Sequence, residues 1–255
     1  MIDIHCHILH GIDDGPKDLK ESLLMAKEAV AQGITSIIAT PHFTSKYENT
    51  KNIIIKKVVE LNAALERENI PLTILPGQEP RIFGEILEDY ENDRILTMND
   101  GGKYVFIELP SNHVPRYTER LLYDIQMKEL TPIIVHPERN SEIVENPDVL
   151  YNLVSNGALT QVTASSLVGD SGKKVKKFSH QLLEANLTHF IASDAHNTTS
   201  RNFRLPAAYE LVEKEYGIQP VYAFSENAEL LVDGKTVFTG PPERIKKSKF
   251  LGIFG

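Results

Sequence analysis

The sequence predicts an α/β fold in which about seven parallel strands close, or nearly close, into a barrel. Seven apolar, β-type runs recur along the chain, and segments with helical periodicity separate most of them. Six of the seven runs end in a histidine or an acidic residue, or reach one within a few positions. The strands of a β/α barrel end at one shared mouth, whereas an open sheet spreads its strand ends along a line. The polar strand ends therefore favour the barrel.

The N-terminal half of the chain contains three of the expected strands. The first covers residues 2–7, and the others cover residues 34–40 and 72–75. Helices are expected near residues 18–32 and 47–69, each with an apolar stripe at helical spacing. Asp18 and Glu21 indicate a capping box at the start of the first helix, and Gly33 indicates its end.

The C-terminal half repeats the alternation of strands and helices. Strands are expected at residues 104–107, 132–135, 159–163 and 189–192. Helices are expected near residues 116–129, 148–156, 173–186 and 205–216. The strand at 159–163 alone has no clear polar ligand at its end.

Composition predicts a single domain spanning residues 1–255, because 41% of the residues are hydrophobic and no linker interrupts the pattern. The one cysteine, Cys6, excludes an internal disulfide and a thiolate metal cluster, and we expect it to pack in the core. The net charge of −8 argues against nucleic-acid binding. No signal peptide or transmembrane segment is apparent, so we expect a cytoplasmic protein. Only the C-terminal tail, residues 243–255, is locally basic, and we expect it to be a frayed terminus, with contact to a partner or a membrane surface as the alternative.

A His-x-His pair at the end of the first strand is the first candidate for metal binding. Side chains alternate across a strand, so His5 and His7 share one face, about 6.6 Å apart, and Cys6 faces away. The turn Gly11-Ile-Asp-Asp-Gly15 brings a carboxylate beside them, from Asp14 or, as an alternative, from Asp13. Two imidazoles and a carboxylate at one strand end can bind a divalent cation.

The complete set of candidate ligands contains five histidines and four carboxylates. These are His5, His7, Asp14, His42, Glu79, Glu108, His136, Asp194 and His196. Nitrogen and carboxylate ligands without thiolate suit Mn²⁺, Fe²⁺ or Zn²⁺. Nine ligands are too many for one ion, so two or three ions sharing carboxylates are expected. Arg139 and Arg201 follow two of these ligands, and guanidinium groups bind phosphate oxygens in matched geometry. The set predicts phosphoester hydrolysis by a metal-activated hydroxide.

The same residues carry a resemblance to a known family. The segments are Asp3-Ile-His5-Cys-His7, Pro41-His42, Gly77-Gln78-Glu79, Glu108, His136-Pro-Glu-Arg139 and Ser193-Asp194-Ala-His196. They resemble the polymerase-and-histidinol-phosphatase (PHP) superfamily. More narrowly, residues 5–15 and 136–140 are similar to the bacterial PHP-type protein-tyrosine phosphatases of capsule and exopolysaccharide operons, the CpsB/YwqE group.

The resemblance implies a distorted (β/α)7 barrel of the PHP type with three divalent ions, Mn²⁺ before Fe²⁺ or Zn²⁺. It implies that the first ion is held by His5, His7, Glu79 and Asp194, the second by Glu79, Glu108 and His136, and the third by Asp14, His42 and His196. It places Arg139 and Arg201 on the substrate phosphate.

The activity implied is hydrolysis of phosphotyrosine on proteins, with a bacterial tyrosine autokinase and enzymes of polysaccharide synthesis as partners. A hydroxide bridging the first two ions is expected to attack phosphorus. A tyrosinate leaving group, with a pKa of about 10, needs little protonation, and His42 or His196 is the nearest group to assist. Glu108 and His136 are expected to be essential for turnover. The alternatives are a histidinol-phosphate phosphatase and a metal-stabilised domain without catalysis.

The other polar residues near these motifs receive structural assignments. We expect Asp3 to lie outside the ligand set, and Glu138 to be a structural partner or to face solvent. Surface or packing roles are expected for the remaining histidines, His10, His113, His180 and His189.

Overall fold

Seven parallel strands lie where the sequence predicts them in the computed structural model, which describes residues 1–245. These strands are β1 (Ile2–Cys6), β2 (Ser36–Ala39), β4 (Thr73–Pro76), β6 (Tyr104–Glu108), β7 (Thr131–Val135), β8 (Leu159–Thr163) and β9 (Phe190–Ala192). Two short strands that the sequence did not predict, β3 (His42–Phe43) and β5 (Glu79–Pro80), also form. Most of the basic tail predicted at residues 243–255 lies outside the described residues.

The strands form three parallel sheets, and no closed barrel is detected within residues 1–245. The strand orders are β1-β2-β4, β3-β5 and β6-β7-β8-β9. Isolated bridges at the carboxyl ends link these sheets, from Cys6 to Ala195 and from Arg81 to Glu108. Pro41 and Pro76 lie where the β2–β4 pairing ends and the β3–β5 pairing begins. Proline has no N–H to donate to a neighbouring strand, which explains the interruption.

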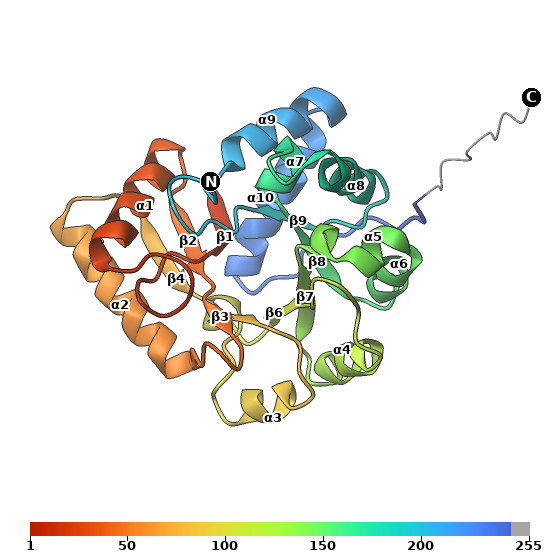
Figure 1. Ribbon diagram of the computed structural model, residues 1–255, viewed down its shortest axis with the longest axis horizontal. Coiled ribbons are helices and arrows are strands. Elements are labelled where there is room, and N and C mark those ends of the chain that lie inside the picture. The colour runs from red at the N-terminus through yellow and green to blue at the C-terminus, as the bar shows by residue number, and fades with distance from the viewer. Residues whose placement is uncertain (246–255) are drawn as a thin grey trace, which may run out of the picture.

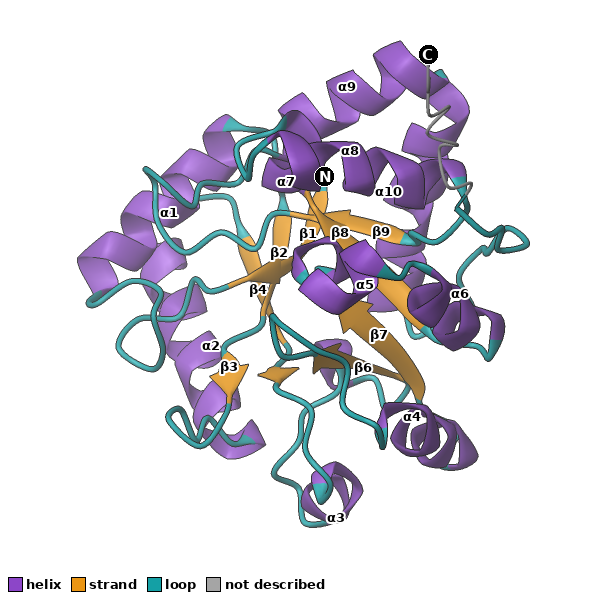
Figure 2. Cartoon of the chain, turned by 45° about the vertical axis from the view of Figure 1, so that its right-hand side comes forward, coloured by secondary structure: helices purple, strands orange, loops and turns teal. Residues whose placement is uncertain are grey.

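Helices surround the strands on the outside, as Figures 1 and 2 show. The six predicted helices are present as α1 (Leu19–Ala31), α2 (Lys51–Arg67), α4 (Thr118–Met127), α6 (Asp148–Ser155), α8 (Lys173–Glu184) and α9 (Leu205–Tyr216). At the start of α1, Asp18 accepts the backbone N–H of Glu21 at 3.0 Å, as the capping prediction requires. No helix among the described residues combines the length and the apolar character that crossing a bilayer needs.

Four α-helices and two 3₁₀ turns within the described part of the chain were not predicted. The helices are α3 (Ile86–Glu91), α5 (Ser141–Glu145), α7 (Ala164–Val168) and α10 (Ile218–Val232), and the turns are η1 (Met98–Asp100) and η2 (Pro137–Arg139). The longest of them, α10, packs along α9 and against β1 and β9. It tolerates Pro220 because a proline in the first turn of a helix lacks only an N–H that would be unpaired anyway.

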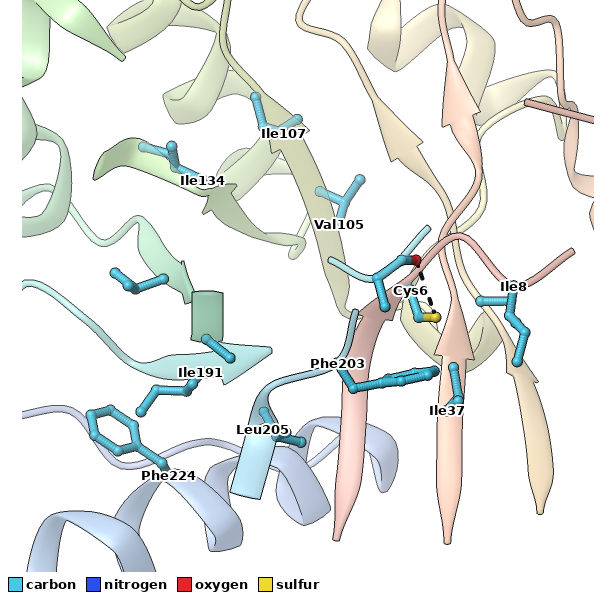
Figure 3. Close-up of a cluster of buried hydrophobic side chains, with 14 of the residues drawn as sticks. Cys6, Ile8, Ile37, Val105, Ile107, Ile134, Ile191, Phe203, Leu205 and Phe224 are labelled. Carbon is cyan, nitrogen blue, oxygen red and sulfur yellow. Dashed lines mark hydrogen bonds between the residues drawn. The ribbon is translucent and has the colours of Figure 1, made fainter. Parts of the chain in front are cut away.

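The core lies between the strands and the surrounding helices. Figure 3 shows Cys6 among these apolar side chains, near Ile37 and Phe203, with its Sγ donating to the carbonyl oxygen of Ala195 at 3.4 Å. Cys6 is buried, as predicted. A second apolar cluster includes Ile4 and Phe106. The Phe106 ring centre is 5.1 Å from that of His5, so an apolar surface adjoins the polar carboxyl ends of the strands.

Candidate metal centre

All nine predicted ligands converge at the carboxyl ends of the strands, with Glu79 at their centre. The Glu79 carboxylate is fully buried. Its oxygens lie 2.8 Å from Nε2 of His136 and 2.8 Å from Nδ1 of His42. They also lie 3.2 Å from Nε2 of His7 and 3.4 Å from Nε2 of His5. Burial alone would raise the pKa of Glu79, but the surrounding imidazoles hold that pKa well below its usual value.

The nine side chains form four overlapping groups whose ligand atoms lie within 4.8 Å of one another. The groups are His7-Asp14-His42-His196, His5-Glu79-His136, His5-His7-Asp194 and His42-Glu79-Glu108. Each predicted ligand belongs to at least one group, and several belong to two. The groups cut across the three expected sets, because His7 joins the group that contains Asp14 and His42 joins the one that contains Glu108.

Unpaired buried atoms point to cation binding at this position. Within residues 1–245, five buried ligand atoms of the cluster have no partner in hydrogen-bonding geometry, although two of them, His42 Nδ1 and Glu79 Oε2, lie 2.8 Å apart. The five are Nε2 of His5, His7 and His196, Nδ1 of His42 and Oε2 of Glu79. Buried nitrogen and oxygen atoms are rarely left unsatisfied in proteins. The donor set therefore fits divalent cations, which would satisfy these atoms together.

Side chains outside the ligand set orient the imidazoles. Asp13 Oδ2 lies 2.7 Å from Nδ1 of His7, and Gln161 Oε1 lies 2.8 Å from Nδ1 of His5. Each contact occupies one ring nitrogen, which leaves Nε2 directed at the cluster. Asp14 instead places Oδ1 3.4 Å from Nε2 of His42 and 3.2 Å from Nε2 of His196. This geometry favours Asp14 over Asp13 as the ligand.

The backbone is left-handed at two of the ligands. His136 has a φ of 36° and Asp194 a φ of 53°, a region that residues other than glycine seldom adopt. His136 lies directly after β7, and Asp194 follows β9 after one intervening residue. Such conformations cost free energy and persist where the surrounding structure enforces them, commonly at functional sites.

Three arginines lie beside the cluster. Arg139 Nη1 contacts Asp194 Oδ2 at 2.5 Å, and Arg201 contacts Asp194 and Asp14, each at 3.2 Å. Arg81, which the sequence reasoning missed, forms a two-pronged pair with Glu108 at 2.7 and 2.9 Å. All three arginines line a cavity of about 200 Å³ together with His42, Glu108, His136 and Asp194. Burial and the adjacent Glu79 carboxylate raise the pKa of Glu108.

Three of the structural assignments made for the remaining polar residues, those of Asp3, Glu138 and His189, are confirmed. Asp3 accepts hydrogen bonds from the hydroxyl and the backbone N–H of Ser193, at 2.5 and 2.9 Å. Glu138 is buried and accepts the backbone N–H of Thr163 at 2.9 Å, so it is a structural partner and does not face solvent. His189 is also buried, at the amino end of β9, which is the opposite end from the metal ligands.

Comparison with known proteins assigns the family. The family model described as capsular polysaccharide synthesis, CpsB/CapC, matches residues 1–233. The chain belongs to the CpsB/CapC family. Among CpsB/CapC relatives, the tyrosine-protein phosphatase YwqE of Bacillus subtilis is 51% identical over 255 residues, covering 100% of both chains. CapC of Staphylococcus aureus is 39% identical over 255 residues, covering 99% of this chain and 100% of CapC.

A solved structure of the same family is also similar. It is one of the crystal structures of YwqE from B. subtilis and CpsB from Streptococcus pneumoniae, which are named as unique metal-dependent tyrosine phosphatases. The match has a TM-score of 0.95 and 51% identity, and covers 97% of this chain and 100% of the solved chain. The backbone arrangement of this CpsB/CapC chain is therefore that of a solved, metal-dependent relative.

Proposed function

We propose that this chain is a metal-dependent protein-tyrosine phosphatase, a phosphoric monoester hydrolase that acts on phosphotyrosine in proteins. The observation that carries the proposal is the junction of a nine-residue ligand cluster with an arginine-lined cavity. Relatives at 51% identity over the full length that are named as tyrosine-protein phosphatases support the same activity.

The ligand cluster is proposed to hold three divalent ions, Mn²⁺ before Fe²⁺ or Zn²⁺. Glu79 is the natural shared ligand, because imidazoles from four directions meet its two oxygens. Three ions carry +6 and the four carboxylates of the set carry −4, which leaves a cationic site for a phosphate dianion. When bound, the ions supply a water molecule of lowered pKa and stabilise charge on the phosphoryl oxygens.

Arg139 and Arg201 are proposed to bind the phosphate. Both guanidinium groups already contact Asp194 and line the cavity, so their N–H groups lie beside the ligand cluster. A guanidinium donates two parallel hydrogen bonds to phosphate oxygens, which orients the ester as well as binding it. Glu108 and His136 line the same cavity, and we propose that both are needed for turnover. A phenolate leaves with a pKa of about 10, so a strong general acid is not required.

The proposal also covers the domain organisation, the fold, the cellular location and the substrates of the enzyme. We place the chain as one domain of residues 1–255 with the distorted seven-stranded barrel of the PHP type, acting in the cytoplasm. The link of the family to capsular polysaccharide synthesis supports substrates among the proteins of that process, including a bacterial tyrosine autokinase. The bridges at Cys6–Ala195 and Arg81–Glu108 support a barrel held together at its carboxyl end.

A comparison of two substrates tests the activity. The purified chain, loaded with Mn²⁺, is assayed for phosphate release from a phosphotyrosyl peptide and from histidinol phosphate. We expect the peptide to be hydrolysed and Glu108→Ala and His136→Ala to abolish the reaction, while His113→Ala, which changes an exposed histidine, has no effect. Preferential hydrolysis of histidinol phosphate would assign the alternative substrate. No release from either, with a lower melting temperature on chelation, would indicate a metal-stabilised domain without catalysis.

A further inference from the structure

A second cavity adjoins the arginine-lined cavity at the carboxyl end of the strands. It has a volume of about 400 Å³ and lies between β3 and the segment that leads into α3, two regions that are neighbours in Figures 1 and 2. Its apolar lining comes from three side chains, Phe43, Ile82 and Phe83. We call this cavity the aromatic groove. Its volume is in the range of sites that bind small ligands or side chains.

The aromatic groove is continuous with the metal centre through Arg81. This side chain lines both cavities, and its guanidinium is paired with Glu108. The next residue, Ile82, donates its backbone N–H to the carbonyl oxygen of Glu108 at 2.9 Å. A polypeptide whose phosphotyrosine enters the arginine-lined cavity therefore meets the groove next to it.

The contact surface that the groove offers is mainly apolar. The Phe43 and Phe83 ring centres are 5.9 Å apart, and the guanidinium of Arg94 lies 5.7 Å from the centre of Phe43. Arg94 is paired with Asp89 at 3.1 Å, so its charge is compensated within the groove. Phe43 and Ile82 are buried and Phe83 is half-buried, which leaves the Phe83 ring available for contact.

An acidic residue without an ion-pair partner in the described part of the chain also limits which side chains the aromatic groove can bind. Glu48 lines the groove, is exposed, and makes no ion pair within residues 1–245. A carboxylate on the ligand would be repelled by it, and an apolar side chain would gain contact with the two phenylalanine rings. The lining therefore disfavours an acidic side chain and gives an apolar one contact with aromatic rings.

We propose that the aromatic groove binds an apolar side chain adjacent to phosphotyrosine in the substrate polypeptide, and that Phe83 is its principal contact. This inference rests on the proposed phosphatase activity and adds a determinant of substrate specificity to it. The groove discriminates between phosphotyrosyl segments by the residue next to the modified tyrosine, and the metal centre and arginines bind the phosphate common to all of them.

The test measures kcat/KM of the Mn²⁺-loaded full chain on three phosphotyrosyl peptides. One has serine on both sides of the phosphotyrosine, one has leucine on the N-terminal side and one has leucine on the C-terminal side. We expect one leucine peptide to exceed the serine peptide by about 5- to 20-fold, the factor that partial burial of one apolar side chain provides. Phe83→Ala should reduce this ratio to about 1, and Phe83→Leu should retain most of it.

The matched control removes the same type of side chain from another cavity. Phe238→Ala truncates an exposed phenylalanine that lines a cavity with Thr188 and His189, at the amino end of β9, and should keep the leucine preference. The proposal is overturned if the wild type shows no preference, if Phe83→Ala retains it, or if Phe238→Ala loses it equally.

Hydrolysis of p-nitrophenyl phosphate distinguishes failure of the groove proposal from failure of the proposed phosphatase activity. This substrate has no residue to place in the groove. If the wild type hydrolyses it but treats all three peptides alike, the groove proposal fails and the proposed activity stands. If the wild type releases phosphate from none of the four substrates, the proposed activity fails and the groove proposal fails with it.

Discussion

Oδ2 of Asp13 lies 2.7 Å from Nδ1 of His7, so this carboxylate contacts the imidazole on the side away from the metal cluster. Its other oxygen accepts the backbone N–H of Gly15 at 2.9 Å. The adjacent Asp14 faces His42 and His196. Two neighbouring acids in one turn therefore make different contacts, and their roles can be separated by mutation.

Replacing each acid by its amide should have distinct effects on metal content. Asp14→Asn removes a carboxylate ligand, and we expect the dialysed protein to lose one ion. Asp13→Asn should keep the number of ions and weaken binding by about 10- to 100-fold, because the orientation and basicity of His7 change. Elemental analysis after dialysis against a graded series of free Mn²⁺ concentrations measures the number of bound ions and their affinity in each variant. The reverse pattern would make Asp13 the ligand.

Arg139→Ala should lower kcat/KM for a phosphotyrosyl peptide by about 10²- to 10³-fold, since it removes hydrogen bonds to charge that develops on the phosphate. Its metal content should be unchanged, because Arg139 contacts the cluster only through Asp194. Inorganic phosphate should also inhibit this variant more weakly. Arg120→Ala, which removes an exposed arginine paired with Asp124 on α4, serves as the control. Wild-type hydrolysis by the Arg139 variant would contradict its assignment.

Chelation should lower the melting temperature of the protein. Each ion present at 100 times its dissociation constant stabilises the fold by about 2.7 kcal/mol, which corresponds to a shift of about 5–10 °C per ion at this size. Differential scanning fluorimetry with EDTA, and then with excess Mn²⁺, measures the loss and its recovery. Glu79→Gln should reduce the response, because Glu79 contacts four histidines of the cluster. An unchanged melting temperature in the wild type would argue against metal binding.

His189 should make the protein less stable as the pH falls. Burial lowers the pKa of this imidazole to about 4, whereas an unfolded chain protonates it near 6.5. Stability is therefore constant above about pH 6.5 and is lost as the pH falls toward 4, by up to about 3 kcal/mol. His189→Asn removes the titration and can still accept the N–H that Thr160 donates. The difference in urea unfolding free energy between variant and wild type, at pH 7 and pH 5, isolates this contribution. Equal losses of unfolding free energy in the wild type and the variant between pH 7 and pH 5 would refute the assignment to His189.

The sequence predicted the strand positions and the candidate ligands because both are local signals. A polar residue directly after an apolar run, as in His136 after β7, identifies a strand end without knowledge of its neighbours. The contacts of Gln161 and Arg81 depend instead on which strands become neighbours. Gln161 lies 156 residues from His5 in sequence, yet the two side chains touch. The signal available for Gln161 was its amide side chain inside the predicted strand at 159–163.

Two features of the fold were not predicted from the sequence: the division of the strands into separate sheets, and the helix α10. The prediction of a closed or nearly closed barrel did not account for the effect of the prolines at positions 41 and 76, which separate the β1-β2-β4 sheet from the β3-β5 sheet. The helix α10 was missed because it has no side-chain cap, follows Gly217 directly and has a proline in its first turn. Its packing against α9, β1 and β9 stabilises it, and such tertiary contacts are not visible in periodicity.

The burial of Cys6 has a consequence for redox chemistry. The chain has one cysteine, its side chain is inaccessible, and burial raises the pKa of its thiol, which disfavours the reactive thiolate. Hydrolases that attack phosphate esters through a thiolate are silenced when peroxide oxidises that sulfur. This chain presents no such sulfur to oxidants or alkylating reagents, so oxidation of a catalytic cysteine is excluded as a route by which peroxide could inhibit it.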